Sequence, residues 1–148
     1  MGRASPDLLD PARYGFRYDL QTRFADIDAN RHINNVAMAA AFEDSRVRFD
    51  SKSGLYTTAD GNRRMMIAAA QIDYIAEAHY PAPLTMHVAV LDIGRTSWSL
   101  AQLAVQEGRP RAFCRAVIVL IDSDRPTPVT DDLRARLDVS RILPAAEA

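Results

Sequence analysis

The chain has 148 residues, of which 48% are hydrophobic and 25% are charged, and its 18 Lys and Arg against 19 Asp and Glu give a formal net charge of -1 at pH 7. A chain of this size can bury a sizeable core as one domain, and no shift in composition indicates a second one. The near-zero charge excludes a strong overall field that would recruit nucleic acid, so any anionic ligand has to be bound by local groups.

The N-terminal segment and the cysteine content bear on location. Residues 1–12 are polar and lack the apolar stretch of a secretory signal. No stretch of the sequence reaches the roughly 18 apolar residues that a membrane span needs. The only cysteine, Cys114, lies in an alternating apolar run that is typical of a buried, reduced thiol. We therefore expect a cytoplasmic protein without a membrane-bound part.

The first regular element is predicted to be a half-buried strand. Apolar and polar residues alternate from Phe16 to Phe24, which is the strand period. Residues 26–35 then place two carboxylates, one imidazole and three carboxamides before an apolar segment. The first amides of a helix are unpaired, so a helix that begins here would supply donors for a developing oxyanion beside a possible base.

A long helix is predicted to follow, over about residues 35–51. This stretch is rich in helix formers and has no Gly or Pro before Gly54. Asn34 or Asn35 can cap its N-terminus. Because its first half is apolar on all sides, we expect residues 36–42 to be surrounded by protein. Asp44 and Arg48 are spaced to pair on an exposed face.

The rest of the chain is predicted to be mostly strands. After a loop over 57–64, an alternating pattern gives a second long strand that includes Tyr74. Prolines and short turns then divide the chain into three further strands that form a meander, over 84–93, 97–107 and 111–122. Pro126 and Pro128 end the sheet, and a short helix is predicted over 131–137.

This order predicts an α+β fold, in which one antiparallel five-stranded sheet wraps around one long buried helix. That architecture is the hot-dog fold. We expect a single domain over 1–148, with a core at about 14–128, an N-terminal extension at 1–13 and a C-terminal tail at 129–148. An open sheet leaves unpaired edge groups, so we expect a homodimer or homotetramer with the active site between subunits.

One segment resembles a known family. Asp26-Ile-Asp28-Ala-Asn30-Arg-His32-Ile-Asn34-Asn35-Val36, followed by Phe42-Glu43-Asp44-Ser45-Arg46, is similar to the signature of the hot-dog acyl-CoA and acyl-ACP thioesterases of the 4-hydroxybenzoyl-CoA thioesterase-like superfamily. The resemblance covers about residues 16–128 and is closer to the acyl-ACP form, because the 4-hydroxybenzoyl-CoA form usually has Gly in place of Arg31. Plant acyl-ACP enzymes carry two hot-dog halves, so a homodimer of this chain would supply the second half.

The resemblance implies three catalytic residues. Asp28 would either attack the thioester carbonyl to form an acyl-aspartyl anhydride or activate a water molecule, and the sequence leaves both routes open. Asn30 and His32 match positions with catalytic roles in related acyl-ACP enzymes, and the imidazole can hold water or stabilise the oxyanion. The alternative for Asp28 is a purely structural role in the turn before the helix.

Other residues are assigned supporting or binding roles. Asn34 and Asn35 support the site through helix capping, and Met38 stands where the family usually has an aromatic residue. The remaining candidates for substrate binding are Phe42 for the acyl group, and Arg95, Thr96 and Ser97 for carrier phosphates. Asp26 is expected to be structural. Glu43 matches a helix carboxylate that acts as base in other hot-dog enzymes, but we favour its pairing with Arg46.

We therefore predict a thioesterase that hydrolyses an acyl-CoA or acyl-ACP thioester to a free acid and a thiol, in fatty acid metabolism. No metal or redox cofactor is expected, and coenzyme A or phosphopantetheine would enter as part of the substrate, with acyl carrier protein as a possible partner. Two alternatives remain open. One is a non-catalytic module that binds acyl thioesters, and the other is a hydratase or dehydratase that leaves the thioester intact.

Overall fold

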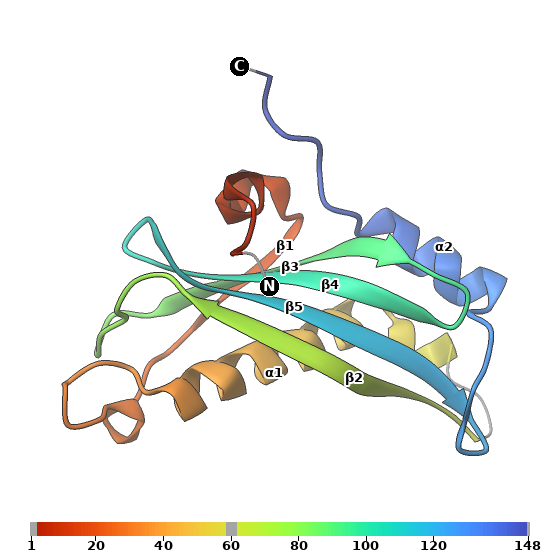
Figure 1. The fold of residues 1–148 in the computed structure, drawn as a ribbon, viewed down its shortest axis with the longest axis horizontal. Coiled ribbons are helices and arrows are strands. Elements are labelled where there is room, and N and C mark those ends of the chain that lie inside the picture. Colours follow the sequence, from red (N-terminus) through yellow and green to blue (C-terminus); the bar gives the residue numbers. More distant parts are fainter. Residues whose placement is uncertain (1–2, 59–61, 148) are drawn as a thin grey trace.

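The computed structural model describes residues 3–58 and 62–147. An antiparallel sheet of six strands curls around one long helix (Figure 1). The elements are β1 (Phe16–Leu20), α1 (Asn35–Lys52), β2 (Arg63–Tyr74), β3 (Leu84–Ile93), β4 (Ser97–Gln106), β5 (Arg109–Asp122), β6 (Arg125–Pro126) and α2 (Asp131–Val139). The strand order is β1-β3-β4-β5-β2, with the short β6 paired to β5. The predicted α+β architecture and the β3-β4-β5 meander are confirmed.

The first strand is shorter than predicted. β1 ends at Leu20, which pairs with Leu84, the first residue of β3. The residue before Leu84 is Pro83, which has no N–H to continue the ladder. The chain instead enters a 3-10 turn at Phe24–Asp26, where the Phe24 side chain is 76% exposed. The prediction that the strand continues to Phe24 is therefore wrong.

The main core lies between α1 and the concave face of the sheet. Helix α1 contributes Met38, Phe42 and Phe49, which pack against strand residues such as Met86 and Leu100. The C-terminal helix α2 adds Leu133 and Leu137, each no more than 1% exposed. The core therefore extends past residue 128 into the C-terminal tail.

Only one side of α1 is buried in the protomer. Met38, Ala41 and Phe42 face the sheet, whereas Val36 is 80% exposed and Ala39 is also on the open side. A single sheet can cover only one side of a helix, so the expectation that protein surrounds residues 36–42 is wrong for the isolated protomer.

The charged half of α1 follows the prediction in part. Arg48 Nε lies 2.9 Å from Asp44 Oδ2, which confirms that pair. The favoured pair between Glu43 and Arg46 is not formed. Arg46 instead donates through Nη1 to Oε1 of the buried Gln102 on β4, at 3.0 Å, because it lies on the side of the helix that faces the sheet.

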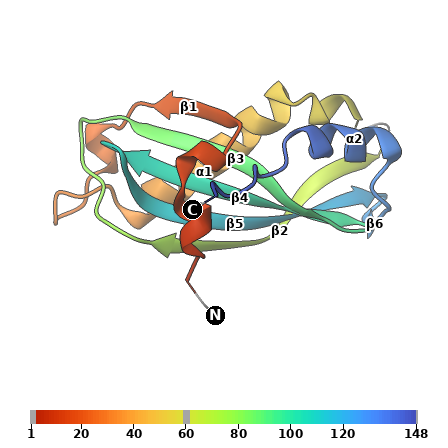
Figure 2. The same ribbon diagram turned by 90° about the horizontal axis from the view of Figure 1, so that it is seen from above.

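A second apolar cluster covers the outer, convex face of the sheet. Strand residues including Leu103 and Phe113 pack there with Tyr14, and Leu8 and Ile142 lie against them. The Tyr14 hydroxyl donates to the Leu8 carbonyl at 2.6 Å. Figure 2 shows the N-terminal and C-terminal segments crossing this face together. Segments near both ends of the described chain, around Leu8 and Ile142, are therefore packed on the sheet.

The middle of the edge strand β2 is exposed. Met66 and Ile67 are 46% and 48% exposed, and the three alanines that follow are also exposed. Its only described neighbour is β5. An exposed edge of apolar residues can pair with another strand. Within residues 3–58 and 62–147, no helix combines the length and apolarity that crossing a bilayer requires.

Asp50, near the end of α1, should make stability depend on pH. Burial raises the pKa of its carboxyl from 3.8 to about 7, and Arg46 opposes this. Between about pH 4 and 7 the folded protein keeps a proton that the unfolded chain releases, so the stability that this proton confers is lost as pH rises through that window. We expect Asp50→Asn to increase stability at pH 8 by about 1 kcal/mol. Urea unfolding at pH 5 and pH 8 measures this, and an unchanged pH dependence in the variant would contradict it.

Candidate active site

The polar cluster before α1 forms a closed loop. An isolated bridge between Ile27 and Ile33 joins its ends. Inside it, the Asp28 N–H donates to the His32 carbonyl at 3.1 Å, and the Arg31 N–H donates to the Asp28 carbonyl at 2.9 Å. Arg31 takes a left-handed conformation with φ of 63° to complete the turn. The side chains of residues 28–32 are therefore presented from one tight turn.

Asp28 has one engaged and one free carboxylate oxygen. Oδ1 accepts the backbone N–H of Asn30 at 2.8 Å, as in an Asx turn. Among the described residues no group bonds Oδ2, and the side chain is exposed in the protomer. The structural role considered for Asp28 is therefore present, but it leaves one oxygen available for chemistry.

The N-terminus of α1 lies next to this carboxylate. The Asn34 side chain accepts the Ala37 N–H at 2.7 Å, which confirms Asn34 as the cap. Asn35 and Val36 follow as the first two helical residues, and within the described part of the chain their N–H groups have no acceptor. Of these two residues, Asn35 lines the same cleft as Asp28, so at least one free backbone donor lies in that cleft.

A cleft of about 420 Å³ joins these groups. Helix and loop residues form one side of it: Asp28, Asn30, His32, Ile33, Asn35 and Met38. The end of β2 and the segment that follows form the other side: Tyr74, Ile75, Ala76, Glu77 and Ala78. The structure thus brings together the three predicted catalytic residues and two of the predicted binding residues.

Glu77 is an ionisable residue of the cleft that the sequence analysis does not single out. Glu77 Oε2 lies 3.0 Å from Nε2 of His32, and the imidazole ring of His79 meets that of His32 edge-on at 5.2 Å. Glu77 is 45 positions beyond His32, three residues after Tyr74, and nothing in the local pattern marks it as a site residue. Only the folded structure reveals its place in the site, because the end of β2 lies opposite the start of α1 across the cleft.

Two buried polar side chains hold the wall that carries Glu77. Arg111, 7% exposed, donates through Nη1 to the Glu77 carbonyl at 2.5 Å, and its own carbonyl accepts the N–H groups of Ile75 and Ala76. Gln106, 1% exposed, bonds both the N–H and the carbonyl of His79, at 2.8 and 2.7 Å. The irregular segment after β2 is therefore fixed by hydrogen bonds.

We expect Gln106→Leu to destabilise the fold by about 2 kcal/mol, because it leaves backbone groups of His79 and Ala82 unpaired at similar side-chain volume. Denaturant unfolding measures the effect. Gln71→Leu is the matched control, since Gln71 Nε2 lies 3.5 Å from Asp73 Oδ1 at the limit of a bond. Equal effects of the two changes would show that Gln106 does not support the wall.

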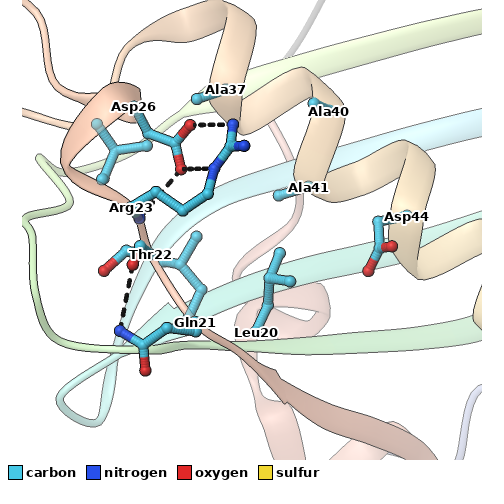
Figure 3. Close-up of a pocket in the computed structure, with 11 residues that line it drawn as sticks. Leu20, Gln21, Thr22, Arg23, Asp26, Ala37, Ala40, Ala41 and Asp44 are labelled. Atoms are coloured by element: carbon cyan, nitrogen blue, oxygen red, sulfur yellow. Dashed lines mark hydrogen bonds and ion pairs between the residues drawn. The ribbon is translucent and has the colours of Figure 1, made fainter.

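A second hollow of about 310 Å³ lies on the other flank of α1 (Figure 3). Small apolar side chains such as Ala37 and Ala41 form its floor, and Asp26 lies at its rim. Asp26 accepts Arg23 Nη2 at 2.7 Å, and this bond holds the pKa of its carboxyl below the usual value. Asp26 is thus engaged in an ion pair, as its expected structural role requires, whereas Asp28 is not.

Several predicted site residues lie elsewhere in the protomer. Phe42 is completely buried in the core and does not line the cleft. Arg95, Thr96 and Ser97 lie at the β3–β4 turn, at the opposite end of β3 from the cleft. Cys114 is buried as predicted, and burial raises the pKa of its thiol to about 11. In the part of the chain that the structure describes, no three His, Cys, Asp or Glu side chains gather closely enough to hold a metal ion.

The sequence matches the family model of the thioesterase-like superfamily over residues 22–137, which includes the cleft loop, α1, all the strands from β2 to β6 and most of α2. The chain belongs to this superfamily. A search of curated proteins finds no match to this thioesterase-like chain.

Solved structures share the fold of this chain. A predicted thioesterase from Bacillus stearothermophilus superposes with a TM-score of 0.78 at 28% identity, covering 88% of this chain and 98% of that one. A Thermus thermophilus thioesterase solved with coenzyme A and Zn gives 0.76 at 22% identity, covering 86% and 94%. A 1,4-dihydroxy-2-naphthoyl-CoA thioesterase from Synechocystis gives 0.72 at 15% identity, covering 83% and 95%. The curled sheet around α1 is therefore the hot-dog fold.

Proposed function

We propose that the protein hydrolyses an acyl-CoA or acyl-ACP thioester to a free acid and a thiol. The observation that carries this proposal is that Asp28, with its free Oδ2, and Asn35, with its unpaired first-turn N–H, line one cleft. Membership of the thioesterase-like superfamily supports it, and so do the CoA thioesterases among the similar structures.

The cleft offers the groups that thioester hydrolysis needs. The carbonyl carbon is attacked either by Asp28, which gives an acyl-aspartyl anhydride that water then cleaves, or by a water whose proton Asp28 accepts. In both routes the thiolate leaves and takes up a proton. The N–H groups of Asn35 and Val36 donate to the carbonyl oxygen as it becomes negative. Asn30 and His32 position the water, and Met38 contacts the acyl group. No metal or redox cofactor takes part, and coenzyme A or phosphopantetheine enters with the substrate in the cytoplasm.

Dimer formation through β2 would bring the carrier-binding hairpin to the cleft. If β2 pairs with its copy in antiparallel fashion, the Arg63 end of one strand lies beside the Tyr74 end of the other. The β3–β4 turn is at the Arg63 end, since Arg63 pairs with Asp122 and the neighbouring Val119 pairs with Ser97. The partner subunit's Arg95 then reaches the end of the sheet that carries Asp28. Such a dimer would explain why the β3–β4 hairpin lies far from the cleft within one protomer.

We expect a homodimer of twice 16.4 kDa in sedimentation equilibrium at micromolar protein. Ile67→Lys should favour the monomer, because a charged side chain on an exposed edge strand opposes pairing. Val139→Lys, at a position that is 88% exposed on α2, is the control and should leave the mass unchanged. A monomeric wild type would contradict the dimer, and a dimeric Ile67→Lys variant would move the interface away from β2.

The direct test is a panel of acyl-CoA and acyl-ACP substrates with a thiol-detecting dye. Thiol release that disappears in Asp28→Ala is the expected result. No release with any acyl group would reject hydrolysis and favour a module that only binds acyl thioesters. Mass spectrometry of the product distinguishes the remaining alternative, because a hydratase or dehydratase adds or removes water and leaves the thioester intact.

A further inference from the structure

The His32–Glu77 pair carries an inference about the catalytic machinery. We propose that Glu77 is a positioning residue, whose carboxylate accepts a hydrogen bond from Nε2–H of His32 and fixes that imidazole in one tautomer. The inference rests on the proposed function. Its geometric basis is the distance of 3.0 Å between Nε2 and Oε2 and the presence of both side chains in the cleft with Asp28.

The backbone that carries Glu77 is fixed from both sides. The Glu77 carbonyl accepts a hydrogen bond from the guanidinium of the buried Arg111. The carbonyl of the next residue, Ala78, accepts a hydrogen bond from the Ile33 N–H at 2.8 Å. The second contact joins the Glu77 segment directly to the loop that presents His32. The spacing between the carboxylate and the imidazole is therefore set by backbone hydrogen bonds and does not depend on a flexible loop.

The pair acts by orientation and contributes little to stability. The side chains of His32 and Glu77 are 30% and 66% exposed in the protomer, and exposed ion pairs stabilise a fold only weakly. A carboxylate that holds Nε2–H leaves Nδ1 of a neutral imidazole as an acceptor. His32 can then accept a hydrogen bond from the attacking water through Nδ1 while the proton of that water passes to Asp28. Glu77 exchanges no proton with the substrate in this scheme.

The test combines kinetics with a spectroscopic readout of the ring. We expect Glu77→Gln to lower kcat roughly 10- to 100-fold with KM within about 2-fold, as for loss of the partner that orients a functional histidine. ¹⁵N NMR of the imidazole should show Nε2–H in the wild type and a mixture of tautomers in the variant, with the His32 signals assigned through His32→Gln. Glu77→Asp should restore part of kcat. Glu147→Gln, which changes an exposed residue of the C-terminal tail, is the charge-matched control and should match the wild type.

The outcomes separate this inference from the proposed function. If the wild type hydrolyses thioesters in an Asp28-dependent manner, but Glu77→Gln keeps full kcat or leaves the His32 tautomer unchanged, Glu77 has no positioning role and the proposed function stands. If no thioester is hydrolysed by the wild type, the proposed function fails, and the NMR comparison still reports whether Glu77 fixes the ring.

Discussion

Replacing Asp28 by Asn should lower kcat/KM for thioester hydrolysis by about 10³-fold or more, because the amide cannot attack the carbonyl or accept a proton from water. The variant should fold normally. An Asn side-chain oxygen still accepts the Asn30 N–H that closes the turn, so the loop geometry of the wild type is kept. Steady-state kinetics with the best acyl substrate, together with a thermal unfolding curve, measure both expectations.

Asp26→Asn is the matched control, because it changes the other carboxylate of the same segment, which is already paired with Arg23. It should reduce stability by less than about 1 kcal/mol and keep most of the activity. Equal activity losses in the two variants would indicate that the loop, and not the Asp28 carboxylate, is what hydrolysis requires.

A single turnover in H₂¹⁸O detects one of the two routes left open for Asp28, the anhydride route in which water attacks the aspartyl carbonyl. If Asp28 is the nucleophile and water attacks the aspartyl carbonyl of the anhydride, the label enters the Asp28 carboxylate and is found by peptide mass spectrometry. If Asp28 activates water that attacks the acyl carbon, the label enters only the released acid. The thiol product is the same in both routes.

Phe42→Ala should destabilise the protein by about 3–5 kcal/mol, the usual loss when a fully buried aromatic residue is truncated in a core. Phe42 is completely buried between α1 and the sheet and does not line the cleft, so the effect on acyl-chain preference should be small. Chemical denaturation gives the stability change, and relative kcat/KM values across chain lengths give the preference.

Val36→Ala is the control on the same helix, since Val36 is 80% exposed in the protomer. It should change the stability of the protomer by no more than about 0.5 kcal/mol. A stable Phe42→Ala variant with a clearly altered chain-length preference would restore the role in acyl binding that the sequence suggested for Phe42.

Much of the fold could be predicted from local patterns. Alternation defined the β3-β4-β5 meander because these strands are consecutive and joined by tight turns. The end of β1 could not be predicted from alternation. The alternating pattern continues to Phe24, but the strand that pairs with β1 begins only after Pro83, so pairing stops at Leu20. Helix α1 was predicted within one residue at its C-terminus, but its exposed side was not, because composition does not show how many faces of a helix are covered.

The candidate site shows the same difference between residues that local sequence predicts and residues that only the fold brings together. Asp28, Asn30 and His32 lie in one loop, so their proximity follows from sequence spacing, and Asn34 follows from capping rules. Glu77 comes from a distant strand end, and only the fold brings it to His32. Arg95 is predicted as a site residue because an arginine can bind carrier phosphates, but within one protomer the length of β3 separates it from the cleft.

The polypeptide ends that cross the outer face of the sheet restrict how larger particles can be built. Leu8, Leu9 and Ile142 already occupy the apolar centre of that face, so two sheets cannot stack back to back there without displacing the chain ends. A contact between two copies of the chain that leaves Leu8, Leu9 and Ile142 in place must therefore use the helical side or the rim of the molecule.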